Sequence, residues 1–166
     1  DELRRPLTTW LRKNGVITHT NCLAQGAEFN DGKVELTWKD AEGETQSETF
    51  DKVLVTVGRR PNTQGWGLEN MGLRMDSDGR FIRIDNQCKT SMKGVFAIGD
   101  VSGEPMLAHR ASAQGEMVAE IIAGHKRIFD PVAIPAIVFT EPEIVSVGLT
   151  PDEAKEAGEE IITGKF

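Results

Sequence analysis

The segment that most constrains the fold is residues 94–100, which read Gly-Val-Phe-Ala-Ile-Gly-Asp. Four consecutive apolar residues, 95–98, run into Gly99 and then directly into the carboxylate of Asp100. A short continuous apolar run is typical of a strand that is buried on both faces of a parallel sheet. In α/β folds, ligands bind at the carboxyl ends of such strands. We therefore expect Asp100 to accept hydrogen bonds there, either from backbone amides or from hydroxyl groups of a ligand.

The residues after this strand predict a helix whose first turn has no side-chain cap. The helical pattern covers residues 108–123, and Gly124 closes it. The side chains at its start, those of Met106, Leu107 and Ala108, contain no oxygen that could accept from the first backbone amides. A bare helix start can face an electron-rich group, because that end carries a partial positive charge. A flavin with its ribitol chain would satisfy both the helix and the neighbouring carboxylate; the alternative is a frayed helix capped by water.

The remaining sequence predicts further helices and strands, which indicates the α/β class. Residues 2–14 carry apolar residues at helical spacing, which predicts a helix at the start of the chain. A further helix is predicted to start at Thr150, with Pro151 in its first position. Alternating or β-branched runs predict an antiparallel meander, and the continuous run at 51–58 predicts a buried parallel strand. The predicted strands are residues 16–22, 33–38, 45–50, 51–58, 80–85, 94–100, 136–140 and 143–148.

A loop rich in glycine, residues 58–67, marks either a domain junction or a binding loop. Gly58 follows a predicted buried strand and would let a phosphate or ribose approach the backbone. Arg59 and Arg60 could pair with phosphates, although arginines in a loop are more typically solvated. No complete GxGxxG motif is present, since residues 65–70 contain only its first two glycines.

The formal net charge of −7 over 166 residues argues against a nucleic-acid-binding surface. No apolar run is long enough to cross a membrane, and no charged leader precedes a short apolar segment. Cys22 and Cys88 lack the spacing of a metal site, so we expect reduced, buried thiols and a cytoplasmic protein. His109 and His125 are isolated, and we expect packing or surface roles for them rather than catalysis.

Several motifs, in sequence order, resemble those of a known enzyme class. Residues 90–101 resemble the second FAD-binding motif of the two-dinucleotide-binding flavoproteins, and residues 55–63 resemble the motif that closes their NAD(P)-binding domain. Residues 105–124 resemble the flavin-facing helix of the dihydrolipoamide dehydrogenase family, and residues 134–150 are similar to the start of its dimerisation domain. The resemblance covers essentially the whole chain.

This resemblance implies that the chain is an internal part of a longer α/β flavoprotein. Residues 1–60 would form the C-terminal half of an NAD-binding domain, residues 61–130 a central FAD-contacting segment, and residues 131–166 the start of a dimerisation domain. Carried over residue by residue, Gly58 would contact NAD. The positions that match FAD contacts are Asp100, Met106, Leu107 and Ala108.

The family oxidises dihydrolipoamide to lipoamide through a redox-active disulfide and FAD, and passes hydride to NAD. The resemblance therefore implies a homodimer that serves the lipoyl-carrying components of a 2-oxoacid dehydrogenase complex. Cys22 and Cys88 do not match the redox pair. That pair, the glycine motif for NAD phosphates and the catalytic His–Glu pair would all lie outside these residues. We therefore expect no catalytic residue and no metal site in the chain, and no NADH production by the isolated segment.

Two alternatives stay open at this point. A related FAD/NAD(P) disulfide oxidoreductase such as mercuric reductase, or a pyridine nucleotide transhydrogenase, would share these motifs, and the upstream sequence, read for a CxxxxC pair, would discriminate between these enzymes. A cofactor-free interaction module would use Asp100 only to cap a turn.

Overall fold

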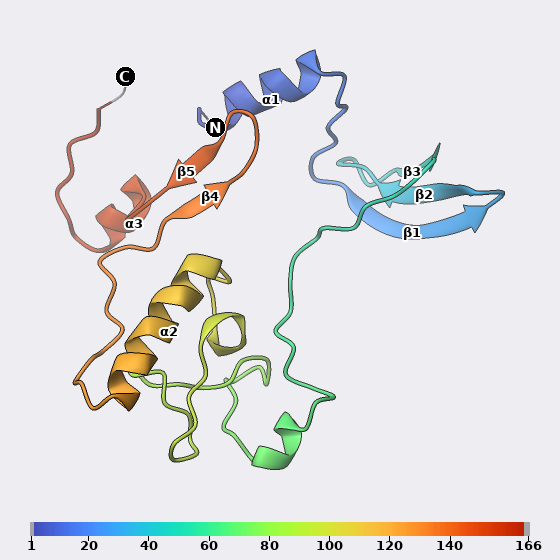
Figure 1. The fold of residues 1–166 in the computed structure, drawn as a ribbon. Helices are drawn as coiled ribbons and strands as arrows, with labels where there is room; N and C mark the ends of the chain where they lie inside the picture. Colours follow the sequence, from blue (N-terminus) through green and yellow to red (C-terminus); the bar gives the residue numbers. More distant parts are fainter. Residues whose placement is uncertain (1, 165–166) are drawn as a thin grey trace. The chain divides into compact units, whose positions relative to one another are not determined.

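The computed structural model describes residues 2–164, which form helices and strands in the order shown in Figure 1. The α-helices are α1 (Arg4–Lys13), α2 (Ala108–Ile122) and α3 (Pro151–Glu156), and two short 3₁₀ helices are η1 (Leu68–Met71) and η2 (Gly99–Ser102). The strands are β1 (Leu23–Asn30), β2 (Lys33–Lys39), β3 (Thr45–Phe50), β4 (Ala136–Val138) and β5 (Ile144–Ser146). The predicted mixture of helix and strand is confirmed.

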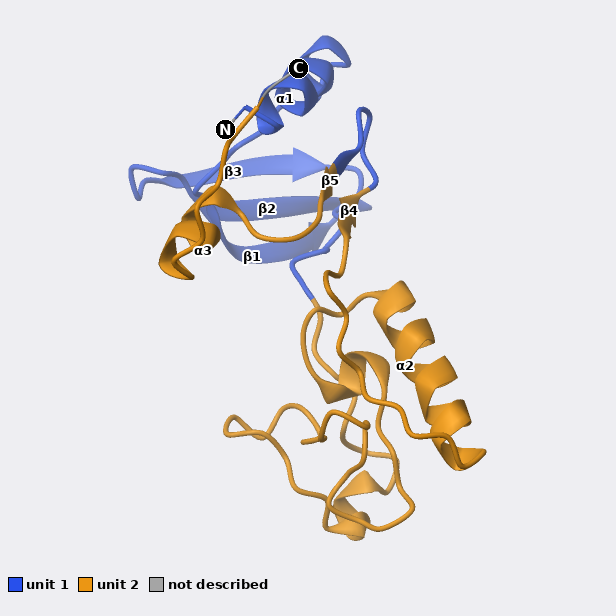
Figure 2. Ribbon diagram, turned by 90° about the vertical axis from the view of Figure 1, so that its left-hand side faces the viewer, with its two compact units in different colours: residues 1–58, 139–144 blue, residues 59–138, 145–166 orange. Residues whose placement is uncertain are grey.

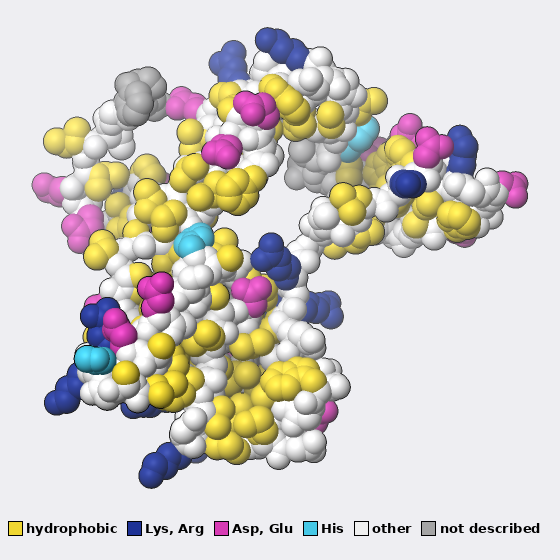
Figure 3. All heavy atoms as spheres, in the orientation of Figure 1, with side chains coloured by type: hydrophobic (Ala, Val, Ile, Leu, Met, Phe, Trp, Pro, Cys, Tyr) yellow, Lys and Arg dark blue, Asp and Glu magenta, His cyan; other side chains and the backbone are white. Residues whose placement is uncertain are grey.

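The chain divides into two compact units, which Figure 2 colours separately. Unit 1 comprises residues 1–58 and 139–144, and unit 2 comprises residues 59–138 and 145–166. No described side chain of unit 1 is fully buried, whereas unit 2 contains all the buried core residues. Large apolar side chains also reach the surface of both units (Figure 3). None of the helices within residues 2–164 has the length and apolar character needed to cross a membrane.

Helix α1 confirms the helix predicted at the start of the chain. It ends after Lys13, where Gly15 adopts a left-handed conformation with φ of +76°. The Val16 amide then donates to the Leu11 carbonyl at 2.9 Å, which is the bond of a Schellman C-cap. The apolar stripe therefore closes on a glycine at the position where a left-handed residue is required.

Strands β1, β2 and β3 form an antiparallel meander, as predicted, but the first strand is not where the sequence placed it. The β1–β2 register starts at Asn30 opposite Lys33, across a turn in which Asp31 and Gly32 both have positive φ. Such two-residue turns match the twist of antiparallel strands. Pairing propagates from the turn until β2 ends, so it covers residues 23–30 and leaves the predicted strand 16–22 without a partner.

The turn between β2 and β3 is held by the carboxylate of Asp40. Its Oδ1 accepts from the backbone amides of Glu42 and Glu44, and its Oδ2 accepts from Gln46 Nε2 at 2.8 Å. The side-chain bond from Gln46, followed by the amides, holds the pKa of Asp40 below its ordinary value.

The prediction of a buried parallel strand at residues 51–58 is wrong in this structure. No described segment pairs with this backbone, and Leu54, Val55 and Val57 are 86%, 73% and 92% exposed. The continuous apolar run shows that these residues suit a buried strand, but a strand exists only where a second backbone supplies its hydrogen bonds.

Unit 2 is built around two small apolar clusters. Leu68, Ile82 and Ala97 form the first, and Cys88, Met117 and Val118 form the second. Ile84 packs against both clusters and joins them. The second cluster contains the buried face of α2, which confirms the helix predicted at residues 108–123.

The segment 94–100 is not a strand of a parallel sheet, and this prediction is corrected. Phe96 forms an isolated antiparallel bridge with Lys89, and the Ala97 amide donates to the Cys88 carbonyl at 3.0 Å. The chain then turns into η2, which contains Asp100. The predicted strand 80–85 is likewise reduced to one bridge, between Met75 and Ile82. Burial in these runs comes from packing against α2 and the neighbouring loops instead of from sheet layers.

The last part of the described chain follows the prediction closely. Strands β4 and β5 pair, and α3 begins after Thr150, whose hydroxyl accepts from the Glu153 amide. The Glu153 carboxylate accepts in return from the Thr150 amide at 2.8 Å, which completes a capping box.

Candidate functional site

Asp100 lies in η2 with its carboxylate available to a ligand. The residue is half-buried, directly after the buried Gly99. Within residues 2–164 its side chain forms no hydrogen bond and no ion pair. The reading in which Asp100 only caps a turn requires backbone donors to its oxygens, and the described residues supply none. An ionised carboxylate in this state can accept from hydroxyl groups.

Gly99 seats the Asp100 segment tightly against α2. Its φ is +69°, and a Cβ built on it would lie 3.0 Å from Cβ of Ala111. Its amide donates to Oε1 of Gln114 at 2.8 Å, and the Gln114 side chain is fully buried. Both the left-handed conformation and the close approach require glycine here. The position of Asp100 is therefore fixed relative to the first two turns of the helix.

The start of α2 carries no side-chain cap, as the sequence predicted. Leu107 occupies the N-cap position in an extended conformation and makes no capping hydrogen bond, and the first turn contains no acidic residue. Met106 and Leu107 are half-buried, and Ala108 is exposed. The first amides of α2 are therefore donors that a ligand can use. In α3 the same positions hold a capping box and two acids.

Arg110, in the first turn of α2, is a buried cation that the sequence reading did not single out. Only 8% of the residue is exposed. Its Nη1 donates to the carbonyls of Gly103 at 2.9 Å, Gly99 at 3.4 Å and Pro105 at 3.5 Å. These three carbonyls belong to the loop that connects Asp100 to the helix start. Arg110 therefore holds that loop from the helix side.

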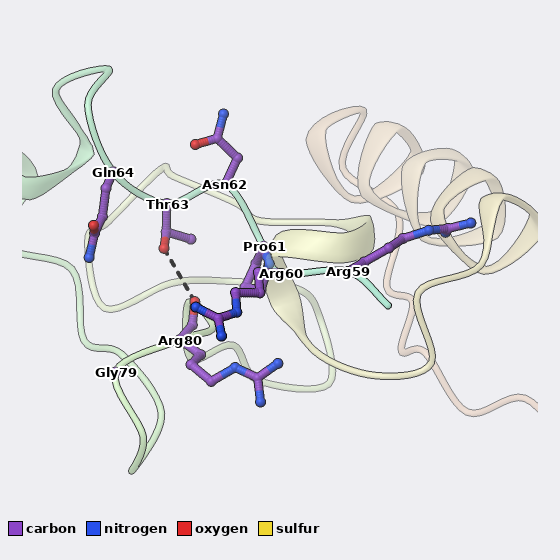
Figure 4. Close-up of a pocket in the computed structure, with 8 residues that line it drawn as sticks. All are labelled: Arg59, Arg60, Pro61, Asn62, Thr63, Gln64, Gly79 and Arg80. Atoms are coloured by element: carbon purple, nitrogen blue, oxygen red, sulfur yellow. Dashed lines mark hydrogen bonds between the residues drawn. The ribbon is translucent and has the colours of Figure 1, made fainter. Parts of the chain in front are cut away.

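Arg59 reaches the same loop from the glycine-rich segment. Its Nη1 donates to the Met106 carbonyl at 3.1 Å. In Figure 4 the Arg59 side chain extends away from those of Arg60 and Arg80, and all three residues line a neighbouring pocket. That pocket has a volume of about 620 Å³, and its lining residues are Arg59, Arg60, Pro61, Asn62, Thr63, Gln64, Gly79 and Arg80. Both arginines therefore line the pocket, and Arg59 in addition donates to the loop that precedes α2.

Gly58 ends unit 1 with a φ of +118°, a conformation that side-chain-bearing residues rarely adopt. A Cβ built there would meet nothing within 4 Å, so the space beside its backbone is open. This geometry suits the close approach of a ligand to the backbone, and the contact with NAD stays a prediction.

The cysteines and histidines take no part in a reactive cluster within the described residues. Cys88 is 1% exposed, as expected, but Cys22 is only half-buried, which corrects the prediction for that thiol. Burial raises the pKa of Cys88, Arg110 lowers it in part, and Asp85 raises it slightly. His109 shares a 2.9 Å hydrogen bond with the Pro135 carbonyl, which is the surface role expected for it. No group of three metal-ligating side chains is found between residues 2 and 164.

Two family models match the chain. The model described as pyridine nucleotide-disulphide oxidoreductase matches residues 1–115, and the model for the dimerisation domain of these proteins matches residues 134–166. The chain belongs to the pyridine nucleotide-disulphide oxidoreductase family. This family membership covers both the loop with Asp100 and the start of α2.

Individual members of the pyridine nucleotide-disulphide oxidoreductase family are similar along the whole chain. Dihydrolipoyl dehydrogenase of Pseudomonas aeruginosa is 49% identical over 166 residues, which is 100% of this chain and 34% of that protein. Dihydrolipoyl dehydrogenase of Geobacillus stearothermophilus is 50% identical over 156 residues, covering 94% of this chain and 33% of that protein. The enzyme of the same name from Halobacterium salinarum is 41% identical over 166 residues. The chain spans about a third of the length of these relatives.

The structure brings Asp100, Met106, Leu107 and Ala108 onto one loop and helix start, as the sequence predicted, and leaves Gly58 at the end of the other compact unit. The sequence reading missed Arg110 and Gln114. Both lie on the buried face of α2, together with Met117 and Val118. Polar residues at the helical spacing of the apolar face are therefore the sequence signal that could have identified them.

Proposed function

We propose that this chain is the part of a dihydrolipoamide dehydrogenase that holds FAD. The observation that carries the proposal is the pair formed by an unpartnered Asp100 carboxylate and an uncapped start of α2. The reaction of the whole protein converts dihydrolipoamide and NAD⁺ to lipoamide, NADH and a proton. The names of the relatives at 41% to 50% identity support the assignment of the substrate.

The residues present fit FAD in their donor and acceptor chemistry. Asp100 would accept from hydroxyl groups of the ribitol chain, and the backbone at Met106, Leu107 and Ala108 would face the flavin ring. The Met106 and Ala108 amides would be the donors there, because the Leu107 amide already donates to the Pro105 carbonyl at 3.0 Å. When bound, FAD supplies the two-electron chemistry that links dithiol oxidation to reduction of the nicotinamide. The chain contributes binding, orientation and a positive helix end, because unpaired amides stabilise negative charge.

The domain roles and partners belong to the same proposal. Residues 1–60 complete an NAD-binding domain with Gly58 beside NAD, residues 61–130 contact FAD, and residues 131–166 begin a dimerisation domain. The family model matched at 134–166 supports a homodimer. The whole protein would act on lipoyl groups carried by a 2-oxoacid dehydrogenase complex in the cytoplasm. The redox disulfide and the catalytic base would come from other parts of the protein.

A chimera tests this proposal directly. This chain replaces the 166 aligned residues of the Pseudomonas aeruginosa relative, which match it over its full length. We expect the purified chimera to retain FAD and to form NADH from dihydrolipoamide and NAD⁺. A chimera that folds as a dimer by size-exclusion chromatography but contains no flavin would overturn the proposal.

Two variants of the chimera locate the activity in the chain. Asp100→Asn keeps the size of the side chain but removes its charge, and we expect weaker FAD retention. Asp78→Asn is the matched control, because that carboxylate lies in an exposed turn.

The isolated chain should form no NADH with the same substrates, whereas NADH production by it would contradict the division of roles.

A further inference from the structure

Arg110 is a buried cation without a carboxylate partner in the part of the chain that the structure describes. It is 8% exposed, and the hydrogen bonds of its guanidinium all run to backbone carbonyls. The ion pairs Lys33–Asp51 and Arg127–Glu120 involve other residues. A buried charge without a counter-charge is costly, because carbonyl dipoles replace only part of the lost hydration.

The position of Arg110 in its helix adds to this cost. It is the third residue of α2, within the first turn, where the helix end is already positive. Helix starts favour acidic side chains, and α3 follows that rule with Asp152 and Glu153 in its first turn. The start of α2 has no acid and no cap, and it contains a buried arginine. Two positive features therefore coincide at one end of one helix.

The three carbonyls that accept from Arg110 also define what the residue can organise. They belong to Gly99, Gly103 and Pro105, and so span the loop from the residue before Asp100 to the residue before Met106. One atom, Nη1, donates to all three, so the end of the guanidinium ties these carbonyls to one point on the helix. Breaking these contacts would let the carboxylate and the helix start move apart.

From these observations we propose that Arg110 is a positioning residue of the cofactor site and the source of positive potential that favours a negatively charged, reduced flavin. It does not touch the cofactor in this assignment; it acts through the loop 99–105 and through its charge. The inference rests on the proposed FAD site and deepens it, since it names the group that sets the spacing and the potential of that site. In this proposal the bound group, in its anionic form, provides the counter-charge for Arg110 that the described residues do not provide.

Variants of the chimera described above separate the two roles of Arg110, which are to hold the loop 99–105 and to supply positive charge. Arg110→Gln removes both the charge and the guanidinium, and Arg110→Lys keeps the charge but not the guanidinium. Arg127→Gln is the matched control, because Arg127 lies beyond the far end of α2 in an exposed ion pair with Glu120. The measurements are the dissociation constant for FAD and the midpoint potential of the bound flavin.

We expect Arg110→Gln to raise the dissociation constant for FAD roughly tenfold to a hundredfold, the factor that accompanies loss of charge-assisted hydrogen bonds. Its flavin potential should become more negative, because a nearby positive charge stabilises the reduced anion. Arg110→Lys should weaken FAD binding but keep a potential close to that of the parent. If Arg110→Gln does not fold, Arg110→Lys still tests the role of Arg110 through FAD binding and flavin potential, since it retains the buried charge.

The outcomes distinguish this inference from the proposed function. A parent chimera that binds FAD and forms NADH, with an unchanged flavin potential in Arg110→Gln, would overturn the role of Arg110 and leave the proposed function intact. A potential that falls equally in Arg110→Lys and Arg110→Gln would also overturn it, because the effect would then follow packing instead of charge. A parent chimera that folds without flavin would overturn both.

Discussion

The backbone amide of Gly99 donates to Oε1 of Gln114 at 2.8 Å, and both residues are buried. This single bond joins the segment that carries Asp100 to the second turn of α2. The side chain of Arg110, one turn earlier on the same helix, donates to the carbonyl of Gly99 and to two other carbonyls in the loop. The helix therefore uses two polar side chains to hold the amide and the carbonyl of one glycine.

Replacing Gln114 with leucine tests the first of these contacts. Leucine fills a similar volume but leaves the Gly99 amide without its acceptor, and an unsatisfied buried donor costs about 1–3 kcal/mol. We expect the free energy of unfolding of the chain to fall by that amount in urea titrations. Gln64→Leu is the control, because Gln64 is exposed and should change stability by less than about 0.5 kcal/mol. Equal effects of the two substitutions would show that the Gly99 contact adds nothing.

Alanine at position 99 should be destabilising for two separate reasons. Its Cβ would lie 3.0 Å from Cβ of Ala111, and the φ of +69° costs about 1–2 kcal/mol for a residue with a side chain. Gly115→Ala is the matched control, since this glycine lies in α2 and its added Cβ would meet Ile98 Cδ1 at an ordinary 3.5 Å. There we expect a gain of up to about 1 kcal/mol from helix propensity. The prediction fails if both variants shift the urea midpoint in the same direction.

Local patterns in the sequence correctly predicted the features that depend only on residues close by in the chain. The helix at residues 2–14, the helix start at Thr150 and the uncapped start of α2 depend on neighbouring residues, and the structure has all three. Strand pairing depends on distant backbone. The runs at 51–58 and 94–100 have the composition of parallel strands but find no parallel partner within the described residues.

The candidate site divides in the same way. Asp100 and the start of α2 could be named from the sequence, because a carboxylate directly after an apolar run and a missing cap are visible there; that the carboxylate has no backbone donor is seen only in the structure. Arg110 and Gln114 were not, because their roles depend on which carbonyls and amides lie opposite them after folding. Their spacing along α2 marked the buried face, but only the fold shows that this face holds a loop as well as an apolar core.

Cys88 should make stability fall at alkaline pH. Burial raises the pKa of its thiol, so the folded chain keeps the proton to a higher pH than the unfolded chain does. The stabilising contribution is complete below the unfolded pKa of about 8.5 and is lost as the pH rises from there through the folded pKa. The slope for one thiol is at most about 1.4 kcal/mol per pH unit.

Urea titrations between pH 7 and 10 measure this slope, and Cys88→Ala should remove it while lowering stability overall. Cys22→Ala is the matched control, since that half-buried thiol is not part of an apolar cluster, and the alkaline loss should persist in it. Persistence of the same slope in Cys88→Ala would assign the loss to other groups.

Arg59 and Arg60 should differ in their effect on FAD binding, although they are adjacent in sequence. Both line the same pocket (Figure 4), but Arg59 Nη1 also donates to the Met106 carbonyl at 3.1 Å, at the residue before the N-cap of α2. In the chimera, Arg59→Ala should raise the dissociation constant for FAD about twofold to tenfold, as expected for one partly exposed hydrogen bond. Arg60→Ala removes the same charge one residue away and should leave the constant nearly unchanged. Because the two variants lose the same charge, a difference between them isolates the contact with Met106, and an equal loss in both would assign the effect to the general positive field of the loop.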